Sequence, residues 1–187
     1  MEFVKICRET AAVLEMFFRA KGGVVEAAVS AIVKSLRAGG KILIFGNGGS
    51  AAEAQHFAAE LVNKFLKKRP ALAAISLTTD TSLITSIGND TSFDRVFSRQ
   101  IEALGRKGDV AIALSTSGSS PNVIEGLKAA KAAGMVTIAL TGKGGGKLAE
   151  APDAAPDYLI DVPSRNVPRI QEIHLVILHA IAEEIEK

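Results

Sequence analysis

Apolar residues recur with a helical period over the first 40 residues of the chain. They mark residues 2–20 as one amphipathic segment and residues 24–38 as a second. Lys21-Gly22-Gly23 separates the two segments, and Gly39-Gly40 follows the second. The pattern predicts two helices, which we interpret as an N-terminal extension over residues 1–40 that packs on the domain and on neighbouring subunits.

From Lys41 onward, short apolar runs alternate with segments of helical spacing. The runs are continuously apolar, as in Val110-Ala111-Ile112-Ala113-Leu114, which is typical of strands covered on both faces of a parallel sheet. We therefore predict an α/β fold, a three-layer doubly wound domain with a five-stranded parallel sheet. The expected strands are residues 41–46, 72–77, 108–114, 135–141 and 157–162, and the expected helices are residues 50–65, 93–105, 121–133, 145–150 and 168–187.

Length and composition are those of one globular domain. No linker or repeat divides the 187 residues, so we expect residues 1–187 to form a single domain. Hydrophobic residues make up 48% of the chain, but aromatic residues make up only 5% and Trp is absent. The core must therefore consist mainly of Ala, Val, Ile and Leu, which suits close packing of helices on a sheet.

The net charge and the cysteine content indicate which kinds of partner and which cellular compartment to expect. A net charge of +2 does not indicate a nucleic-acid-binding protein, and we interpret the basic run Lys64, Lys67, Lys68 and Arg69 as a solvated loop. The single cysteine, Cys7, excludes an intrachain disulfide and points to a reducing compartment. No apolar run is long enough to span a bilayer, and the first residues lack a signal-peptide layout. We expect a cytoplasmic protein without a membrane partner.

A glycine-rich turn, residues 46–50, follows the first expected strand and leads into an Ala-rich helix. Ser50 stands at the expected N-cap of this helix, and Glu53 follows at the capping-box spacing. The free N–H groups and the dipole at a helix N-terminus favour a bound anion. The turn therefore predicts an anion site.

The same turn matches the dinucleotide-binding pattern G-x-G-x-x-A through Gly46, Gly48 and Ala51. Asp80 could then act as the acid that binds the ribose. However, Asp80 lies well beyond the usual spacing of about 20 residues, and this hypothesis leaves a second phosphate-like turn unexplained. A nucleotide site is the weaker alternative.

The second turn, residues 115–120, reads Ser-Thr-Ser-Gly-Ser-Ser and follows another expected strand. Ser120 suits the N-cap of the next helix, and Pro121 suits its first position. Hydroxyls and helix-terminal amides together form a neutral receptor for a phosphate monoester, and ligands of open α/β sheets bind at the carboxyl ends of the strands. The structural alternative is an ordinary turn rich in Ser and Thr.

All three histidines lie in two expected helices. His56 and Glu60 are four residues apart and share one helix face. In the last helix Gln171 and His179 share a broad face two turns apart, whereas His174 lies off that face and is interpreted as structural or exposed. Two imidazoles, a carboxylate and an amide oxygen could coordinate Zn²⁺, although structural histidines would show the same pattern.

Taken together, these motifs resemble the bacterial phosphoheptose isomerases of the sugar isomerase (SIS) superfamily. The resemblance covers nearly the whole chain. The serine-rich turn is shared by SIS domains in general, whereas the QHFAAEL and RIQE…H segments are more specific for this branch. The segments that carry the resemblance are GNGGSA from Gly46, AQHFAAEL from Ala54, Asn89-Asp90, STSGSSPNVI from Ser115 and RIQEIHLVILH from Arg169.

The resemblance implies an SIS fold and a reaction. The family converts sedoheptulose 7-phosphate to D-glycero-D-manno-heptose 7-phosphate through an enediol(ate), in heptose biosynthesis. It implies Glu60 as the base and His179 as the acid. The substrate contacts that it implies are Asn47, Gly48, Ser50, Glu60, Asn89, Asp90, Ser115, Thr116, Ser117, Ser120 and Gln171.

The resemblance also implies a homotetramer with sites shared between subunits, and one Zn²⁺ per subunit held by His56, Glu60, Gln171 and His179. A zinc-bound Glu60 is a poorer base, and a zinc-bound His179 is not a free acid. The ion would therefore either move when substrate enters or polarise the substrate oxygens.

Two positions depart from the family pattern. Lys64 stands where Arg is expected and loses the bidentate fork of a guanidinium group. Pro168 stands where some members carry an acid, and it suits the start of a helix instead.

Two functional alternatives stay open. A tetrameric SIS-domain regulator that binds the replication initiator protein shares the QHFAA and RIQE segments, but it lacks the acid and the imidazole that match Glu60 and His179. An SIS isomerase for another sugar phosphate would share the phosphate turn and differ only in the sugar pocket.

Overall fold

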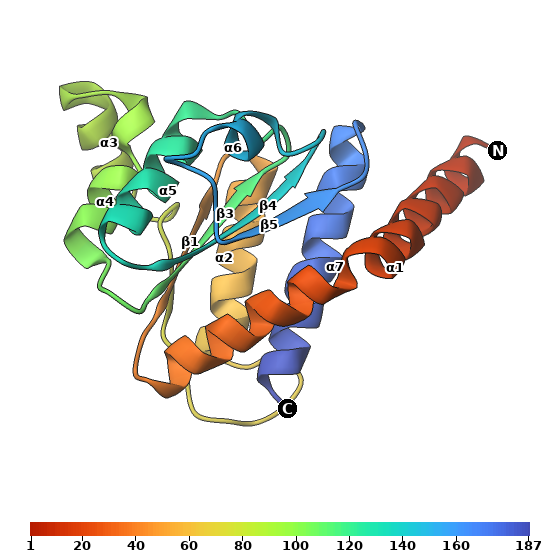
Figure 1. Cartoon of the computed structure of the whole chain (residues 1–187), viewed down its shortest axis with the longest axis horizontal. Helices are drawn as coiled ribbons and strands as arrows, with labels where there is room; N and C mark the ends of the chain where they lie inside the picture. Colours follow the sequence, from red (N-terminus) through yellow and green to blue (C-terminus); the bar gives the residue numbers. More distant parts are fainter.

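The computed structural model, which describes residues 1–187, contains one sheet in which all five strands run parallel. The strand order is β2-β1-β3-β4-β5, so the prediction of a five-stranded parallel sheet is confirmed (Figure 1). The strands are β1 (Ile42–Gly46), β2 (Ala74–Ser76), β3 (Val110–Ser115), β4 (Val136–Gly142) and β5 (Tyr158–Val162).

Helices cover both faces of the sheet. One hydrophobic cluster joins one sheet face to α1, α2 and α7, and a second cluster joins the other face to α4, α5 and α6. The helices are α1 (Glu2–Arg37), α2 (Gly49–Val62), α3 (Thr81–Asp90), α4 (Ser98–Leu104), α5 (Pro121–Ala132), α6 (Gly146–Glu150) and α7 (Val167–Ile185), with the 3₁₀ helix η1 (Phe93–Arg95).

The continuous apolar runs follow from this double burial. In β1, Ile42 and Ile44 point into the first cluster, and Leu43 and Phe45 point into the second. Because successive side chains of a strand point to opposite faces, a strand buried on both faces has to be apolar at every position. The interpretation of these runs as buried parallel strands is confirmed.

The prediction of two N-terminal helices is wrong: residues 2–37 form one continuous helix. Each glycine in a helix interior costs about 1 kcal/mol relative to Ala, so Gly22 and Gly23 together cost only about 2 kcal/mol. Burial of Phe17, Val25 and Ile32 against the sheet outweighs that cost. A single long helix therefore replaces the expected pair.

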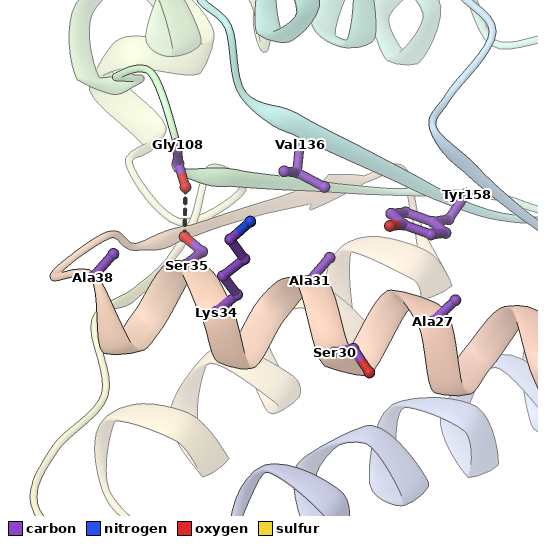
Figure 2. Close-up of a pocket in the computed structure, with 9 residues that line it drawn as sticks. All are labelled: Ala27, Ser30, Ala31, Lys34, Ser35, Ala38, Gly108, Val136 and Tyr158. Atoms are coloured by element: carbon purple, nitrogen blue, oxygen red, sulfur yellow. Dashed lines mark hydrogen bonds between the residues drawn. The ribbon is translucent and has the colours of Figure 1, made fainter.

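The C-terminal half of α1 lies across the amino ends of the strands (Figure 2). The hydroxyl of Ser35 donates a 2.6 Å hydrogen bond to the carbonyl oxygen of Gly108, just before β3. Beside this bond, Ala31, Val136 and Tyr158 line a hollow of about 520 Å³. In contrast, the N-terminal half of α1 extends away from the sheet and is largely exposed (Figure 1). No helix combines the length and the apolar character needed to cross a membrane.

Between β2 and β3 the structure differs from the predicted elements. The expected helix over residues 93–105 is divided into η1 and α4, and α3 precedes them. Asp80 is the N-cap of α3, where its carboxylate accepts a 2.9 Å hydrogen bond from the N–H of Leu83. This capping role gives Asp80 a structural function and weakens the nucleotide alternative.

The basic run after α2 is only partly a solvated loop. Lys64, Lys67 and Lys68 are exposed, as expected. Arg69, however, is 12% exposed, and its Nε lies 3.1 Å from a carboxylate oxygen of Glu186. The side chain of Arg69 is therefore part of the packed structure.

Thermal and chemical stability are expected to depend on the buried His174. This side chain is fully buried, and its Nε2 lies 3.0 Å from the carbonyl oxygen of Thr141, which requires a proton on Nε2. Burial lowers the pKa of His174 from 6.5 to about 4, so the unfolded chain binds an extra proton between these pH values. The contribution is present above pH 6.5 and is lost as the pH falls to about 4.

Urea unfolding measured from pH 7 to pH 4 should show this loss. We expect the free energy of unfolding to fall by about 3 kcal/mol more in the wild type than in His174→Gln. Equal pH slopes for the two proteins would contradict the assignment of a neutral, buried His174.

Candidate active site

The two polar turns lie side by side at the point where the strand order reverses. The chain leaves β1 toward β2 on one side, and β3 pairs with β1 on the other side. In open α/β sheets this switch point, at the carboxyl ends of the strands, is the usual place for a ligand. The side-chain amides of Asn47 and Asn122 join the two turns through two reciprocal hydrogen bonds of 2.9 Å.

The start of α2 differs from the predicted capping box. The helix begins at Gly49, its N-cap is Gly48, and no side chain accepts a capping hydrogen bond. Ser50 lies within the first turn and is buried. Glu53 is half-buried, its Oε2 has no hydrogen-bond partner, and burial raises its pKa to about 7. Ser50 as N-cap and Glu53 as its capping partner are therefore both wrong.

The hydroxyls of the serine-rich turn belong to the residues that directly precede α5. Ser120 is the N-cap of α5, as predicted, but its hydroxyl makes no capping bond and lies 3.4 Å from that of Ser115. Thr116 makes no side-chain hydrogen bond within the chain. The hydroxyl of Ser117 accepts a hydrogen bond from the N–H of Ser119, and the hydroxyl of Ser119 donates to the carbonyl of Ser117 and accepts from the N–H of Lys147. The hydroxyls at residues 115, 116, 117 and 120 form the candidate phosphate receptor.

The turn that precedes α6 packs against the serine-rich turn at Gly118. Gly118 has φ +61°, and a Cβ there would lie 1.9 Å from the carbonyl oxygen of Gly145. The N–H of Leu148, in α6, donates a 3.0 Å hydrogen bond to the carbonyl oxygen of Gly118. The backbone of the turn at Gly118 is thus in direct contact with the turn that precedes α6.

A carboxylate and two imidazoles meet where α2 packs on α7. Nε2 of His56 lies 2.9 Å from Nε2 of His179, and both face the carboxylate of Glu60. Oε1 of Glu60 lies 3.1 Å from Nε2 of His56 and 3.5 Å from Nε2 of His179. Oε2 of Glu60 is buried and has no hydrogen-bond partner.

This cluster fits a zinc ion. Four ligand atoms placed tetrahedrally about 2.0–2.1 Å from Zn²⁺ lie about 3.3 Å from one another. The three separations between the ligand atoms of His56, Glu60 and His179 are 2.9, 3.1 and 3.5 Å. Two imidazole nitrogens and a carboxylate oxygen are also a donor set that zinc prefers.

Phe65 completes the surroundings of His179 and was missed by sequence reasoning. The two rings are stacked, with centroids 5.5 Å apart and planes inclined by 17°. Phe65 is the last residue of the helix expected over residues 50–65, but α2 ends at Val62, and Phe65 is 114 residues from His179 in the chain. Asn122 was likewise not predicted to have a role, although it directly follows the serine-rich turn.

Three other predicted site residues, Gln171, Asn89 and Asp90, lie away from the cluster of His56, Glu60 and His179. Gln171 packs on the first turn of α2 so closely that a Cβ on Gly49 would lie 2.5 Å from its Nε2. Asn89 and Asp90 are exposed at the end of α3, where they bond to each other, on the opposite side of the sheet from α7 (Figure 1). Within one chain the predicted residues therefore form three groups. They are the switch-point group with Gln171, the cluster of His56, Glu60 and His179, and the pair on α3.

The fold and the switch-point turns define the class of protein. A protein-family model described as SIS domain matches residues 6–142. The chain therefore belongs to the SIS domain family.

Comparison with individual proteins shows which branch of the SIS domain family is similar to this chain. The chain is 51% identical to a phosphoheptose isomerase of Desulfovibrio desulfuricans over 176 residues, which cover 94% of this chain and 82% of the relative. Its fold is similar to that of the phosphoheptose isomerase from Neisseria gonorrhoeae, with a TM-score of 0.91, 44% identity and coverage of 99% and 97%. The phosphoheptose isomerase from Francisella tularensis gives a TM-score of 0.93 at 36% identity, with coverage of 100% and 97%. Within the SIS domain family, the chain groups with the phosphoheptose isomerases.

Substitution of Gly118 tests how tightly the serine-rich turn is held. Gly118→Ala should destabilise the fold by about 2 kcal/mol or more, because it combines the strain of positive φ with a clash against Gly145. Gly144→Ala is the matched control, since Gly144 has φ +84° with nothing near its Cβ position, and it should lose only about 1 kcal/mol. Equal melting temperatures for the two variants would refute the close contact.

Proposed function

We propose that this chain is a sugar-phosphate isomerase that converts sedoheptulose 7-phosphate to D-glycero-D-manno-heptose 7-phosphate in heptose biosynthesis. The observation that carries the proposal is the meeting of Glu60 and His179 in a chain that also has a serine-rich turn at its switch point. A regulator that only binds a protein does not need this carboxylate–imidazole pair. The identity to phosphoheptose isomerases over most of the chain supports the seven-carbon substrate over another sugar phosphate.

The reaction moves one carbon-bound proton, and the proposed roles account for it. Glu60 removes a proton from C1, the C–H electron pair forms the C1=C2 bond, and His179 gives a proton to the C2 oxygen. Glu60 then returns its proton to C2 while His179 takes the proton from the C1 oxygen, which leaves the aldehyde at C1. The buried, unpaired Oε2 of Glu60 supports its role as the proton carrier.

We propose further that His56, Glu60 and His179 hold one Zn²⁺ per chain, with Gln171 of a second copy as the fourth ligand. When bound, Zn²⁺ would polarise the substrate oxygens and stabilise the enediolate charge. His179 can act as the acid only when its Nε2 is not bound to the ion, so its two proposed roles require the ion to move when substrate enters. The arrangement of Glu60 supports both of its proposed roles. Oε1 faces the two imidazoles, whereas Oε2 stays free to accept a proton.

We propose a homotetramer, because one chain alone does not assemble all these groups. Gln171 lies eight residues from His179, about 12 Å along α7, and its amide packs on Gly49. Gly49 in turn lies about 16 Å along α2 from Glu60. A site that combines the cluster with Gln171 and the serine-rich turn would therefore take residues from a second copy.

Exposed apolar side chains support this assembly. In the N-terminal half of α1, Phe3 is 79% exposed, and Val4, Ile6 and Met16 are also open to solvent. Such a surface suits packing between subunits. The single cysteine, Cys7, supports a cytoplasmic location, because a reducing compartment leaves it free.

Replacement of the proposed base tests the reaction. Glu60→Gln keeps the shape of the side chain but removes the proton acceptor, so kcat should fall by at least about 100-fold. Binding of sedoheptulose 7-phosphate, measured by calorimetry, should change less than twofold, because the serine-rich turn is unaltered. Retained turnover in the folded variant would exclude Glu60 as the base. A loss of binding or folding would instead indicate a structural role.

Metal analysis tests the zinc proposal without any assay of activity. The purified wild type should contain about one Zn²⁺ per chain, and His56→Ala should lose it because one imidazole ligand is removed. His174→Gln is the control, since it removes the histidine that lies outside the cluster and should keep the metal. Equal metal content in His56→Ala and the wild type would refute the site.

A further inference from the structure

Glu186, at the end of α7, has a carboxylate that is almost fully enclosed. Its side chain is 1% exposed although it lies one residue from the C-terminal Lys187. Its two oxygens accept hydrogen bonds from the backbone N–H groups of three consecutive residues, Phe65, Leu66 and Lys67, at 2.9, 2.9 and 2.8 Å. The side chain of Glu186 thus binds three consecutive backbone N–H groups of the loop after α2 to the end of α7.

The environment of Glu186 keeps it charged. Burial acts to raise its pKa, but the three N–H donors and Arg69 outweigh that effect and lower the pKa to about 2. A glutamine at this position could not replace the carboxylate. Its one carbonyl oxygen would have to serve all the donors, and its NH₂ group would face N–H groups.

Arg69 extends this attachment to the proposed catalytic base. Its Nε donates to Glu186 at 3.1 Å. Its Nη2 donates to the carbonyl oxygen of Glu60 at 2.8 Å, and its Nη1 donates to that of Leu61 at 2.8 Å. Arg69 therefore satisfies two of the carbonyl groups that the last turn of α2 leaves unpaired.

The same loop places an aromatic ring on the proposed acid. The N–H of Phe65 is bonded to Glu186, and the ring of Phe65 stacks on the imidazole of His179. His179 and Glu186 belong to the same helix end, seven residues or about two turns apart. Loss of the carboxylate would free the loop, and with it the ring that limits the rotation of His179.

We propose that Glu186 is a positioning residue of the active site, which holds residues 65–69 so that Phe65 and Arg69 keep His179 and Glu60 in their reactive arrangement. The expected change in kcat rests on the proposed isomerase function. The geometric consequence, a fixed imidazole of His179, is independent of the substrate.

Kinetics of four variants test the inference. Glu186→Gln should lower kcat about tenfold or more with KM changed less than twofold, because misplaced catalytic groups affect the chemical step while the phosphate receptor is untouched. Phe65→Leu should show the same pattern. The double variant should lose little more than either single variant, because both act through one contact. Glu184→Gln is the control, since it removes an exposed carboxylate of the same helix that pairs only with Lys187.

NMR of the His179 ring gives a readout that does not depend on turnover. In the wild type the stacked Phe65 should shift the ring protons of His179 upfield, and this shift should disappear equally in Glu186→Gln and Phe65→Leu. If Glu186→Gln does not fold, Glu186→Asp retains the charge but withdraws it by one methylene, and it should show the same losses.

The outcomes separate the two proposals. Unchanged kcat and an unchanged His179 signal in a folded Glu186 variant would overturn the positioning role, as would additive losses in the double variant. A wild type that fails to convert the substrate, but whose His179 signal responds to both substitutions, would refute the isomerase function and leave the positioning role intact.

Discussion

Burial of both faces of the parallel sheet is the constraint on which the rest of the structure depends. Because most side chains of the central strands pack under helices on both faces, the groups of the candidate site lie at the strand ends and on the helices. The carboxyl ends of β1 and β3 meet at the switch point, where Asn47 and Asn122 join the two polar turns. The same packing presses α2 against α7, which brings together His56, Glu60 and His179.

The switch point and the packed pair of helices α2 and α7 carry different kinds of chemical group. The switch point offers hydroxyls and a helix N-terminus, which suit a phosphate that has to be held but not altered. The helix pair offers groups that exchange protons or bind a metal. An isomerase of phosphorylated sugars needs both tasks in one site, and their separation along α2 within one chain is the reason why we propose an assembly of several copies.

Much of this arrangement could be predicted from the sequence because it is encoded locally. Continuous apolar runs gave the five strands, and the i, i+4 spacing placed His56 beside Glu60. The errors arose where tertiary packing outweighs local preference. Burial of α1 on the sheet overrides Gly22 and Gly23, and α2 begins at Gly49 without the capping box expected from Ser50.

Long-range contacts could not be predicted from the sequence. Phe65 meets His179, and Glu186 binds the loop after α2, across more than 100 residues of chain with no periodic pattern to announce the pairing. Helix geometry does predict that Gln171 lies two turns from His179 in the same chain. It does not predict the contact between two copies that would bring Gln171 of one copy to His179 of the other. Such contacts depend on how the whole sheet and its helices pack.

The most direct test of the central claim is an NMR assay of sedoheptulose 7-phosphate with the purified wild-type protein in D₂O. The proposed proton transfer predicts D-glycero-D-manno-heptose 7-phosphate that carries solvent deuterium at C2, because the proton on Glu60 exchanges with solvent before it is returned. Absence of the aldose product from folded protein would contradict the isomerase function. An aldose product without deuterium would contradict the enediolate mechanism with an exchanging carboxylate.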